Sequence, residues 1–484
     1  MFIYLSNDYA IRNESDCSYL IQFGRMIGKK AQFFDSFCIP PFMGYILSHI
    51  GDYEIEESLT KISDVLGISE NTIRHFVNQL TDNEESKKFV VNEDKTIYLP
   101  PFLLSTSNDK PKVNVLEVDD FDYKGDYVIR RPYMPISINL MITTRCTTDC
   151  IYCYADRSLR PIMDTDRILT LIDEMHEAGV INITLTGGDI LTRKDWSCIL
   201  KKMREYGYFP FISTKTPITE SEIITLRELG YDEIQFSLDT NSEEILREMV
   251  KAPTGYFQSV KEFLENSGKH GLNILVRSVL TRLNADVKLV KDFYEFLASF
   301  DAVKQWTLTP AFFSNYKADE YRHLEVNNDD LKDVYKFVHQ DNLKFRIGLN
   351  KISEEGYKLK TTDNVEDFVR TNQTCVANST GLSILANGKC SVCEMLYEEE
   401  EYLLGDVNSN TIREIWNSKK ALDLYALNQE VIEGTSPCSS CKVFSVCRNG
   451  YGKKVCYVDI CKSGKSLSFP DPRCPKAEEY DMVF

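Results

Sequence analysis

The regular alternation of apolar strands and helices between residues 135 and 310 is the feature that most constrains the fold. Apolar runs of strand length recur at Ile136–Ile142, Ile181–Leu185, Phe209–Ser213, Glu233–Leu238, Asn273–Leu280 and Lys304–Leu308. Amphipathic helical patterns such as Trp196–Tyr206 and Phe257–His270 separate these runs. Buried strands that alternate with helices predict βα units and a parallel sheet. About six units are too few for the closed eight-unit barrel, so we expect an α/β fold with a partial (β/α)6 barrel over residues 135–310.

The 484 residues exceed the length of one domain, about 100–150 residues, so further domains are expected on both sides of the barrel. Residues 1–104 contain short strands, a helix, two helices joined by a tight turn, and a final strand pair. These elements are expected at Phe2–Leu5, Tyr19–Phe23, Pro41–Ile50, Glu56–Leu66, Glu70–Leu80, Phe89–Val91 and Thr96–Leu99. A helix, the turn Gly67-Ile68-Ser69 and a second helix capped by Ser69 predict a winged helix-turn-helix domain.

Three more segments complete the expected organisation. The polar stretch Ser105–Asn114 predicts a linker, which we extend over residues 105–134. Residues 311–370 are expected to be a bridging helical region that includes Asp329–Gln340. Residues 371–484 form a Cys-rich domain with one amphipathic helix, Ile412–Leu427, between two groups of cysteines.

The charge and the apolar runs limit the partners and the location. With 56 Lys and Arg against 73 Asp and Glu, the net charge is −17, which argues against a nucleic acid as the main partner. The N-terminus does not resemble a signal peptide, and no apolar run approaches the ~20 residues that span a bilayer. We therefore expect a cytoplasmic protein with no membrane and no nucleic acid as partner.

The fifteen cysteines are unevenly distributed. Three lie within residues 146–153 and nine between Cys375 and Cys474, whereas Cys17, Cys38 and Cys198 stand alone. Disulfides are rare in a reducing cytoplasm, so closely spaced cysteines there indicate metal sites. Isolated cysteines are more often small buried hydrophobic residues.

Cys146, Cys150 and Cys153 follow directly after the first strand of the expected barrel. Their spacing places three thiolates on one short loop, at the strand end where βα enzymes keep their active sites. A [4Fe–4S] cluster usually takes four Cys ligands, so three local ligands would leave one iron open to a substrate, as in catalytic metal sites. The alternatives are a zinc site and three unrelated buried cysteines.

This Cys-x3-Cys-x2-Cys motif, with Tyr152 before the last Cys, resembles the signature of the radical S-adenosylmethionine (SAM) superfamily. The resemblance implies that SAM chelates the open iron through its amino and carboxylate groups. One electron from the reduced cluster then cleaves SAM to a 5′-deoxyadenosyl radical, which abstracts a hydrogen atom from the substrate. Cys146, Cys150 and Cys153 would be the catalytic cluster ligands.

The same resemblance extends along the expected barrel strands. Gly187-Gly188-Asp189 resembles the family's Gly-Gly-Glu, which contacts the methionine amino group, although the acid here is one methylene shorter. The other implied SAM contacts lie at the ends of the third and fourth strands and on the fifth: Ser213, Lys215, Ser237, Asp239 and Arg277. Glycines that permit a turn and ordinary strand-end polarity are the alternatives.

The cysteines near the C-terminus resemble a SPASM domain, which implies two auxiliary [4Fe–4S] clusters. The matching residues are Cys375, Gly388, Cys393, Cys438, Cys441, Cys447 and Cys474. The family has a further Cys four residues after the position of Cys447, where this chain has Tyr451. Cys456 or Cys461 would substitute, or one cluster lacks a ligand, and Cys390 is an extra candidate. Two zinc ribbons built on Cys-x2-Cys pairs are the alternative.

Residues 1–105 carry 9 Lys and Arg against 15 Asp and Glu, a net charge of −6. A DNA-binding domain needs several cations to neutralise phosphates, so DNA recognition is poorly supported. A winged domain fused to a radical SAM–SPASM enzyme resembles the recognition element of maturases for ribosomally made peptides, such as sactisynthases and ranthipeptide synthases. In that family a leader peptide adds a strand to the domain's sheet edge through main-chain hydrogen bonds.

The resemblance thus implies an enzyme that modifies a precursor peptide, whose leader binds residues 1–104, and that forms a thioether between a Cys sulfur and a carbon. Flavodoxin or ferredoxin would supply the electron. Because Tyr451 stands where the family has a cysteine, one auxiliary cluster could have an open iron, which would bind the substrate thiolate. If all irons of that cluster have protein ligands, the cluster would only relay electrons. The alternatives are a carbon–carbon cross-link, an oxidation like that of sulfatase maturases, and an iron–sulfur redox regulator that binds DNA.

Overall fold

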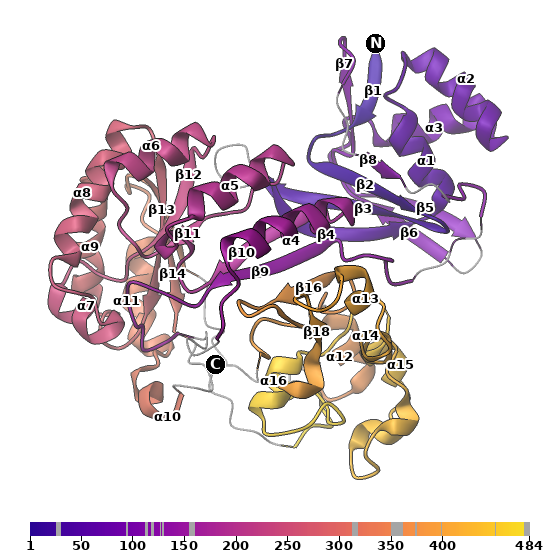
Figure 1. The fold of residues 1–484 in the computed structure, drawn as a ribbon. Coiled ribbons are helices and arrows are strands. Elements are labelled where there is room, and N and C mark those ends of the chain that lie inside the picture. The colour runs from indigo at the N-terminus through magenta and orange to yellow at the C-terminus, as the bar shows by residue number, and fades with distance from the viewer. Residues whose placement is uncertain are drawn as a thin grey trace. The chain divides into compact units, whose positions relative to one another are not determined.

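The computed structural model divides the chain into two compact units, Met1–Tyr133 and Met134–Phe484 (Figure 1). Each unit has a hydrophobic core of its own. The structure describes residues 1–25, 31–92, 95–111, 115–117, 121–125, 127, 130–153, 160–311, 318–349, 362–372, 375–397, 399–450 and 452–478.

The described residues of the first unit form three small sheets and three helices. Its strands are β1 (Phe2–Leu5), β2 (Tyr9–Glu14), β3 (Cys17–Arg25), β4 (Ala31–Ile39), β5 (Lys87–Asn92), β6 (Lys95–Leu99), β7 (Leu104–Ser107) and β8 (Val115–Glu117). The strand order in the largest of these sheets is β4-β3-β2-β8, so β4 is an edge strand there, while β5 and β6 form an antiparallel hairpin.

The helices of this unit are α1 (Pro41–His49), α2 (Ile55–Leu66) and α3 (Glu70–Leu80). Gly67 ends α2 with a positive φ of 69°, a conformation that glycine adopts without strain. The Ser69 hydroxyl then caps α3 by accepting a hydrogen bond from the Thr72 amide at 3.2 Å. The helices and the hairpin lie where the sequence predicts them.

The segment expected as a linker, 105–134, contributes instead to the first unit. β7 pairs antiparallel with β1, and β8 pairs parallel with β2. Both strands are short: β7 has one apolar residue in four, and β8 has only three residues. Runs of this length carry little of the alternating pattern from which a strand is predicted.

The second unit begins with the parallel strands that the sequence predicts. They are β9 (Ser137–Thr143), β10 (Asn182–Gly187), β11 (Ser213–Thr214), β12 (Glu233–Ser237), β13 (Asn273–Leu280) and β14 (Val303–Pro310). Of the expected strand Phe209–Ser213, only the last residue, Ser213, belongs to a strand in the structure, β11. β15 (Arg346–Leu349) adds a parallel strand next to β14, inside the region expected to be only helical.

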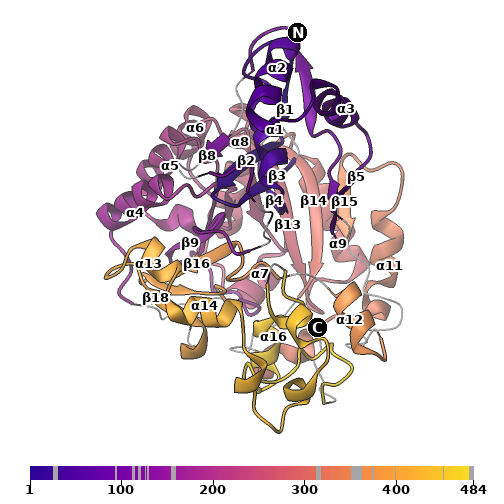
Figure 2. The ribbon, with the colours of Figure 1, turned by 90° about the vertical axis from the view of Figure 1, so that its right-hand side faces the viewer.

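Helices connect these strands and cover one face of them. They are α4 (Thr165–Glu177), α5 (Trp196–Glu205), α6 (Glu220–Glu228), α7 (Glu243–Val250), α8 (Tyr256–Lys269), α9 (Val287–Ala298), α10 (Ala318–Tyr321) and α11 (Asn328–Val338). Figures 1 and 2 show α6, α8 and α9 along the outer side of β11 to β14. Two ring contacts between helices and strands, Phe236 with Phe263 and Phe293 with Trp306, lie in this interface.

The remaining elements of this unit form its C-terminal part. They are α12 (Val365–Thr371), β16 (Gly381–Ile384), β17 (Lys389–Ser391), β18 (Leu403–Asp406), α13 (Ile412–Trp416), α14 (Lys419–Tyr425), α15 (Phe444–Arg448) and α16 (Tyr457–Lys462). β16 pairs parallel with β9, which gives one sheet of order β10-β9-β16-β17-β18 beside a second of order β11-β12-β13-β14-β15.

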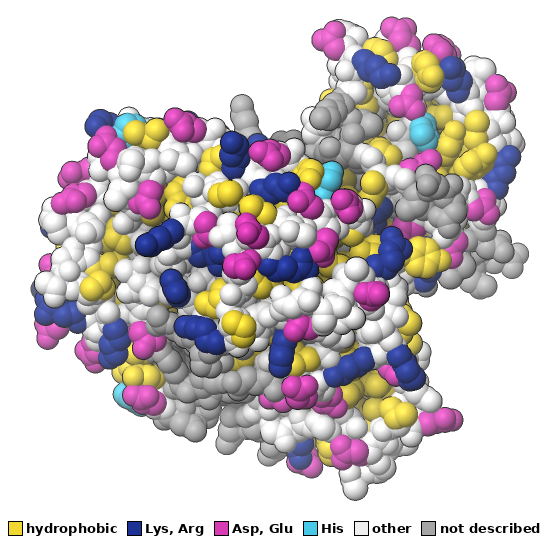
Figure 3. All heavy atoms as spheres, in the orientation of Figure 1, with side chains coloured by type: hydrophobic (Ala, Val, Ile, Leu, Met, Phe, Trp, Pro, Cys, Tyr) yellow, Lys and Arg dark blue, Asp and Glu magenta, His cyan; other side chains and the backbone are white. Residues whose placement is uncertain are grey.

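The single helix predicted at Ile412–Leu427 is two helices, α13 and α14. The Ser418 hydroxyl accepts a hydrogen bond from the Ala421 amide at 3.2 Å and so starts a new helix. Among the helices that the structure describes, none is long and apolar enough to cross a bilayer. On the face shown in Figure 3, acidic and basic side chains are interspersed.

Candidate functional site: a cysteine loop at the strand ends

The loop with Cys146, Cys150 and Cys153 leaves the carboxyl end of β9 and is fixed by its backbone. The amides of Asp149 and Ile151 donate to the carbonyls of Val250 and Met249 at the end of α7, at 2.8 and 2.9 Å. These contacts fold the ten-residue stretch after β9 against the barrel. The motif residues are thereby held on one turn.

The three thiols differ in their surroundings. The Thr148 hydroxyl lies 3.7 Å from the Cys146 sulfur and 3.6 Å from the Cys150 sulfur. Cys150 is buried, whereas Cys146 and Cys153 are partly exposed. Burial raises the pKa of the Cys150 thiol, and the nearby ammonium of Lys215 opposes this rise. A thiolate at Cys150 therefore depends on a positive partner.

Gly187 and Gly188 let the end of β10 pack onto the start of this loop. The amides of Gly188 and Asp189 donate to the carbonyls of Thr143 and Arg145, at 2.8 and 2.7 Å. A Cβ at Gly187, where φ is +134°, would lie 2.1 Å from the Thr143 oxygen, and a Cβ at Gly188 would lie 2.0 Å from the Arg145 oxygen. Close backbone approach therefore requires both glycines.

We expect Gly188→Ala to slow SAM cleavage by about a hundredfold, because the two backbones must separate and the cysteine loop must shift by about 1 Å. The rate of 5′-deoxyadenosine release, divided by the iron content, measures the effect. Gly434→Ala is the matched control, since a Cβ there meets no atom within 4 Å. A Gly188→Ala enzyme as fast as the wild type would contradict this account.

The Asp189 carboxylate is buried and bound by its own chain. It accepts hydrogen bonds from the Thr214 hydroxyl, the Lys215 and Thr216 amides and the Thr216 hydroxyl, at 2.8–2.9 Å. The Leu191 amide donates a fifth, at 3.1 Å. These donors fill the roughly four acceptor positions of a carboxylate. The expected contact with the amino group of SAM would require Asp189 to exchange partners; in the structure it braces the turn after β11.

Lys215 and Asp239, also expected to contact SAM, are paired with each other. The Lys215 ammonium lies 2.9 Å from Asp239 Oδ2, and their side chains are 10% and 1% exposed. The Tyr152 hydroxyl donates to the same oxygen at 2.5 Å, and the Val279 amide donates to Oδ1 at 2.8 Å. Burial works to lower the pKa of Lys215, but the charges of Asp239 and Cys150 outweigh it and raise the pKa. The ion pair thus ties the cysteine loop to β12 and β13.

Ser213, Ser237 and Arg277 are brought together on one face of the sheet. Ser237 is opposite Arg277 in the β12–β13 register, and Gln235 donates to the Ser213 hydroxyl at 2.7 Å. Ser213 and Arg277 are exposed. The residues next to them along each strand are buried and face the core that the helices cover. Gln235 and Thr307, the latter opposite Arg277 on β14, share this polar face. Neither residue was predicted from the sequence, although the alternation of polar with apolar residues along these strands was the available signal.

Four of the C-terminal cysteines, Cys438, Cys441, Cys447 and Cys474, line one cavity. The cavity wall is otherwise apolar apart from Arg448 and Asp471. A [4Fe–4S] cluster takes one thiolate for each iron, so four cysteines that line one cavity fit such a cluster. Within the described residues, no three His, Cys, Asp or Glu side chains converge on a point that could hold a single metal ion.

Cys375, Cys393 and Cys456 make up a second set, within which the charge of Cys375 acts on the other two thiols. Burial raises the pKa of Cys393 to about 11 and that of Cys456 to about 12, and the charge of Cys375 adds to the rise at both. Cys390 lies instead in the main core, with its sulfur 3.9 Å from the Gly388 carbonyl oxygen, and Cys461 lies beside Tyr402. Tyr451 lies outside the described residues.

Comparison with known proteins agrees with this site. Residues 140–293 match the family described as the radical SAM superfamily, and residues 375–442 match SPASM, an iron–sulfur cluster-binding domain. The chain is 30% identical over 269 residues to a probable GTP 3′,8-cyclase of Methanothermobacter thermautotrophicus, which covers 54% of this chain and 85% of that protein. A second probable GTP 3′,8-cyclase, from Methanothermobacter marburgensis, is 26% identical over 271 residues, with the same coverage.

The whole fold is also similar to solved structures. Streptococcus suis SuiB bound to the precursor peptide SuiA aligns with a TM-score of 0.60 and 14% identity, over 98% of this chain and 100% of that one. SuiB bound to SAM aligns with a TM-score of 0.58 and 13% identity, over 97% and 99%. At this identity the similarity shows the fold. The two matched domains make this chain a member of the radical SAM superfamily with an SPASM domain, whose cofactors are SAM and [4Fe–4S] clusters.

Proposed function

We propose that this radical SAM enzyme modifies a ribosomally synthesised precursor peptide and joins a Cys sulfur of that peptide to a carbon atom. The observation that carries the proposal is that the chain matches the fold of SuiB over 98% of its length, which includes the unit Met1–Tyr133. SuiB is described as bound to a precursor peptide. A radical SAM barrel alone would not need this unit.

Residues 1–104 are the proposed leader-binding part. β4 is an edge strand of the sheet β4-β3-β2-β8, so its outer edge offers main-chain donors and acceptors to an added strand. Such an addition takes its affinity from main-chain hydrogen bonds and does not need a basic surface. The net charge of −6 over residues 1–105 is therefore compatible with a peptide ligand and unfavourable for DNA.

In the barrel, Cys146, Cys150 and Cys153 would hold the catalytic cluster. When bound, this cluster and SAM supply the 5′-deoxyadenosyl radical. Ser213, Ser237 and Arg277 share an exposed polar face and are the proposed contacts for the polar groups of SAM. The side chains of Lys215, Asp239 and Tyr152 would act through the cysteine loop, which they hold in place.

The proposed cross-link balances as a two-hydrogen oxidation of the peptide. A C–H hydrogen atom passes to the 5′-deoxyadenosyl radical, the thiol loses its proton to solvent, and a C–S bond forms. One electron remains and must be accepted. The proposed acceptors are the two auxiliary clusters, one at Cys375, Cys393 and Cys456 and the other at Cys438, Cys441, Cys447 and Cys474. Flavodoxin or ferredoxin is the proposed external electron donor to the catalytic cluster.

The test uses the full chain, reconstituted anaerobically with iron and sulfide and supplied with SAM and dithionite. The candidate substrates are short Cys-containing peptides from reading frames beside the gene. We expect 5′-deoxyadenosine to appear, the peptide to lose the mass of two hydrogen atoms, and one peptide thiol to become resistant to alkylation. A mass loss with every thiol still alkylated would replace the thioether by a carbon–carbon bond or another oxidation.

Two control incubations separate the other candidates. GTP replaces the peptide because the curated relatives are described as GTP 3′,8-cyclases; GTP consumption without peptide modification would overturn the peptide proposal. The second incubation contains SAM alone with the reduced protein. Complete absence of 5′-deoxyadenosine in every incubation would favour an iron–sulfur regulator.

A further inference from the structure

Arg448, the last residue of α15, is a buried cation at the wall of the four-cysteine cavity. The residue is 1% exposed and follows Cys447 directly. Its Nη1 donates to the Leu467 carbonyl at 3.0 Å, and its Nη2 donates to the Phe469 carbonyl and to the Cys438 sulfur, the latter at 3.6 Å. The guanidinium therefore contacts the thiol of Cys438, which we assign as a cluster ligand.

This guanidinium is incompletely partnered by the described residues. Its Nε is buried and has no hydrogen-bond partner among them. Among the described residues, its hydrogen bonds go to two carbonyl oxygens and the Cys438 sulfur, and none of these partners is a carboxylate. A buried cation without a carboxylate is costly unless another anion compensates it. The cavity that Arg448 lines, with its four cysteines, is where such an anion would lie.

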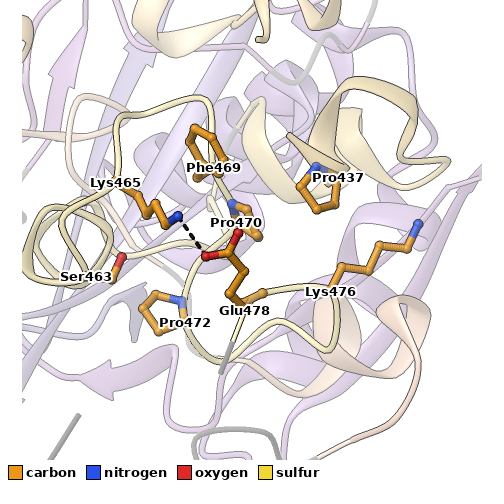
Figure 4. A pocket seen from close by; sticks show the side chains of 9 residues that line it. Pro437, Ser463, Lys465, Phe469, Pro470, Pro472, Lys476 and Glu478 are labelled. Carbon is orange, nitrogen blue, oxygen red and sulfur yellow. Dashed lines mark hydrogen bonds and ion pairs between the residues drawn. The ribbon is translucent and has the colours of Figure 1, made fainter. Parts of the chain in front are cut away.

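A second pocket is lined in part by the segment that Arg448 binds. This pocket, of about 290 Å³, is open to the surface, and Pro437, Phe469 and Pro470 are among its lining residues (Figure 4). Pro470 also lines the four-cysteine cavity, so the cavity and the pocket adjoin at this residue. Because Arg448 binds the carbonyls of Leu467 and Phe469, it fixes the segment beside Pro470 as well as the cysteine wall.

We propose that Arg448 is a positioning residue that sets the reduction potential of the auxiliary cluster held by Cys438, Cys441, Cys447 and Cys474. Its guanidinium donates to the Cys438 sulfur, and its unpartnered Nε would be available to donate to a cluster held by these four cysteines. Reduction adds a negative charge to a cluster that its thiolates already make anionic. A fixed cation and hydrogen bonds to the sulfurs favour that reduced state and raise the potential.

The inference rests on the assignment of a cluster to these four cysteines and not on the peptide substrate. It therefore survives a failure of the peptide proposal, and its own failure leaves that proposal intact. Potential is the decisive readout, because an arginine that only supports the fold would not shift one cluster selectively.

The experiment is an anaerobic redox titration followed by electron paramagnetic resonance. The background is the full chain with Cys146, Cys150 and Cys153 replaced by alanine, which leaves the auxiliary clusters as the source of signal. Into it we introduce Arg448→Gln, which removes the charge but keeps a neutral donor, and Arg448→Lys, which keeps the charge but loses the planar set of donors. Lys442→Met is the matched control: it removes an exposed charge beside Cys441.

We expect Arg448→Gln to lower the midpoint of one auxiliary signal by about 59 mV, a tenfold change in a one-electron equilibrium. The other signal and the Lys442→Met titration should match the parent protein. Arg448→Lys should give an intermediate midpoint. An unchanged midpoint in Arg448→Gln, or equal shifts of both signals, would overturn the proposal.

If Arg448→Gln fails to retain iron, Arg448→Lys decides the question alone. A lysine midpoint below that of the parent supports the proposal, since the ammonium cannot reach all the acceptors of the guanidinium. A lysine midpoint equal to that of the parent overturns it.

Discussion

Replacing Cys150 with alanine will abolish the release of 5′-deoxyadenosine and remove the catalytic cluster. Cys146, Cys150 and Cys153 are the three thiols of the loop after β9, and a cluster that loses one of three protein ligands has no nearby substitute there. Cys150 is also the buried member of the set, and the charge of the Lys215 ammonium acts on its thiol. Anaerobic reconstitution followed by iron analysis and product quantification measures both effects.

The control for this variant is Cys198→Ala. Cys198 is exposed on α5 and belongs neither to the loop after β9 nor to the C-terminal cysteines. Its loss should therefore change neither the iron content nor the amount of product. The auxiliary clusters should remain in Cys150→Ala, because their cysteines belong to the C-terminal segment. A Cys150→Ala protein that still cleaves SAM would place the catalytic cluster elsewhere.

The second large effect concerns the buried ion pair behind that loop. Lys215→Met leaves the Asp239 carboxylate uncompensated, and Asp239→Asn does the same to the Lys215 ammonium. Breaking a buried pair from one side typically costs about 3–5 kcal/mol. For a unit as large as Met134–Phe484 this lowers the melting temperature by about 4–7 °C, which calorimetry or circular dichroism of the anaerobic protein would detect.

The pH dependence of this effect follows from the sign of the shift. The folded structure raises the pKa of Lys215, so its stabilising contribution is complete below the unfolded lysine value, about 10.4, and is lost only as pH rises toward the folded value. The melting-temperature difference should therefore be constant between about pH 6 and pH 9. A difference that vanished within this range would contradict a charged Lys215.

A surface pair provides the comparison. Arg247 and Glu243 are 3.2 Å apart, but their side chains are 65% and 56% exposed. Such pairs contribute about 0–1 kcal/mol because water and salt screen them, so Arg247→Met should change the melting temperature by a few degrees at most. Equal effects of Arg247→Met and Lys215→Met would show that burial does not strengthen the Lys215–Asp239 pair.

The cysteine chemistry was predictable from the sequence because it depends on short spacings. Three thiols within eight residues after a strand lie on one loop in any βα fold, and the structure shows them there. The turn at Gly67, the cap at Ser69 and the alternation that produces β9 to β14 are local in the same sense. Each arises from residues within a few positions of one another.

The partners of the polar strand-end residues were decided only by the tertiary structure. Asp189, Lys215 and Asp239 were predicted as SAM contacts. In the fold, Asp189 binds the loop after β11, 27 residues later in the chain, and Lys215 binds Asp239, 24 residues later. Tyr152 binds Asp239 from 87 residues away. A carboxylate at a strand end has the same sequence context whether it faces a ligand or a neighbouring loop. Sequence alone therefore cannot distinguish the two.

The same holds for the sheet edges and for the second cysteine set. β16 pairs with β9 although more than two hundred residues separate them, and the short strands β7 and β8 join the first unit through main-chain pairing. Cys438, Cys441, Cys447 and Cys474 share a cavity with Arg448, whereas Cys390 joins the core. The sequence by itself determined which residues can carry iron–sulfur chemistry; long-range packing decided which of them meet, because contacts between distant segments leave no local pattern.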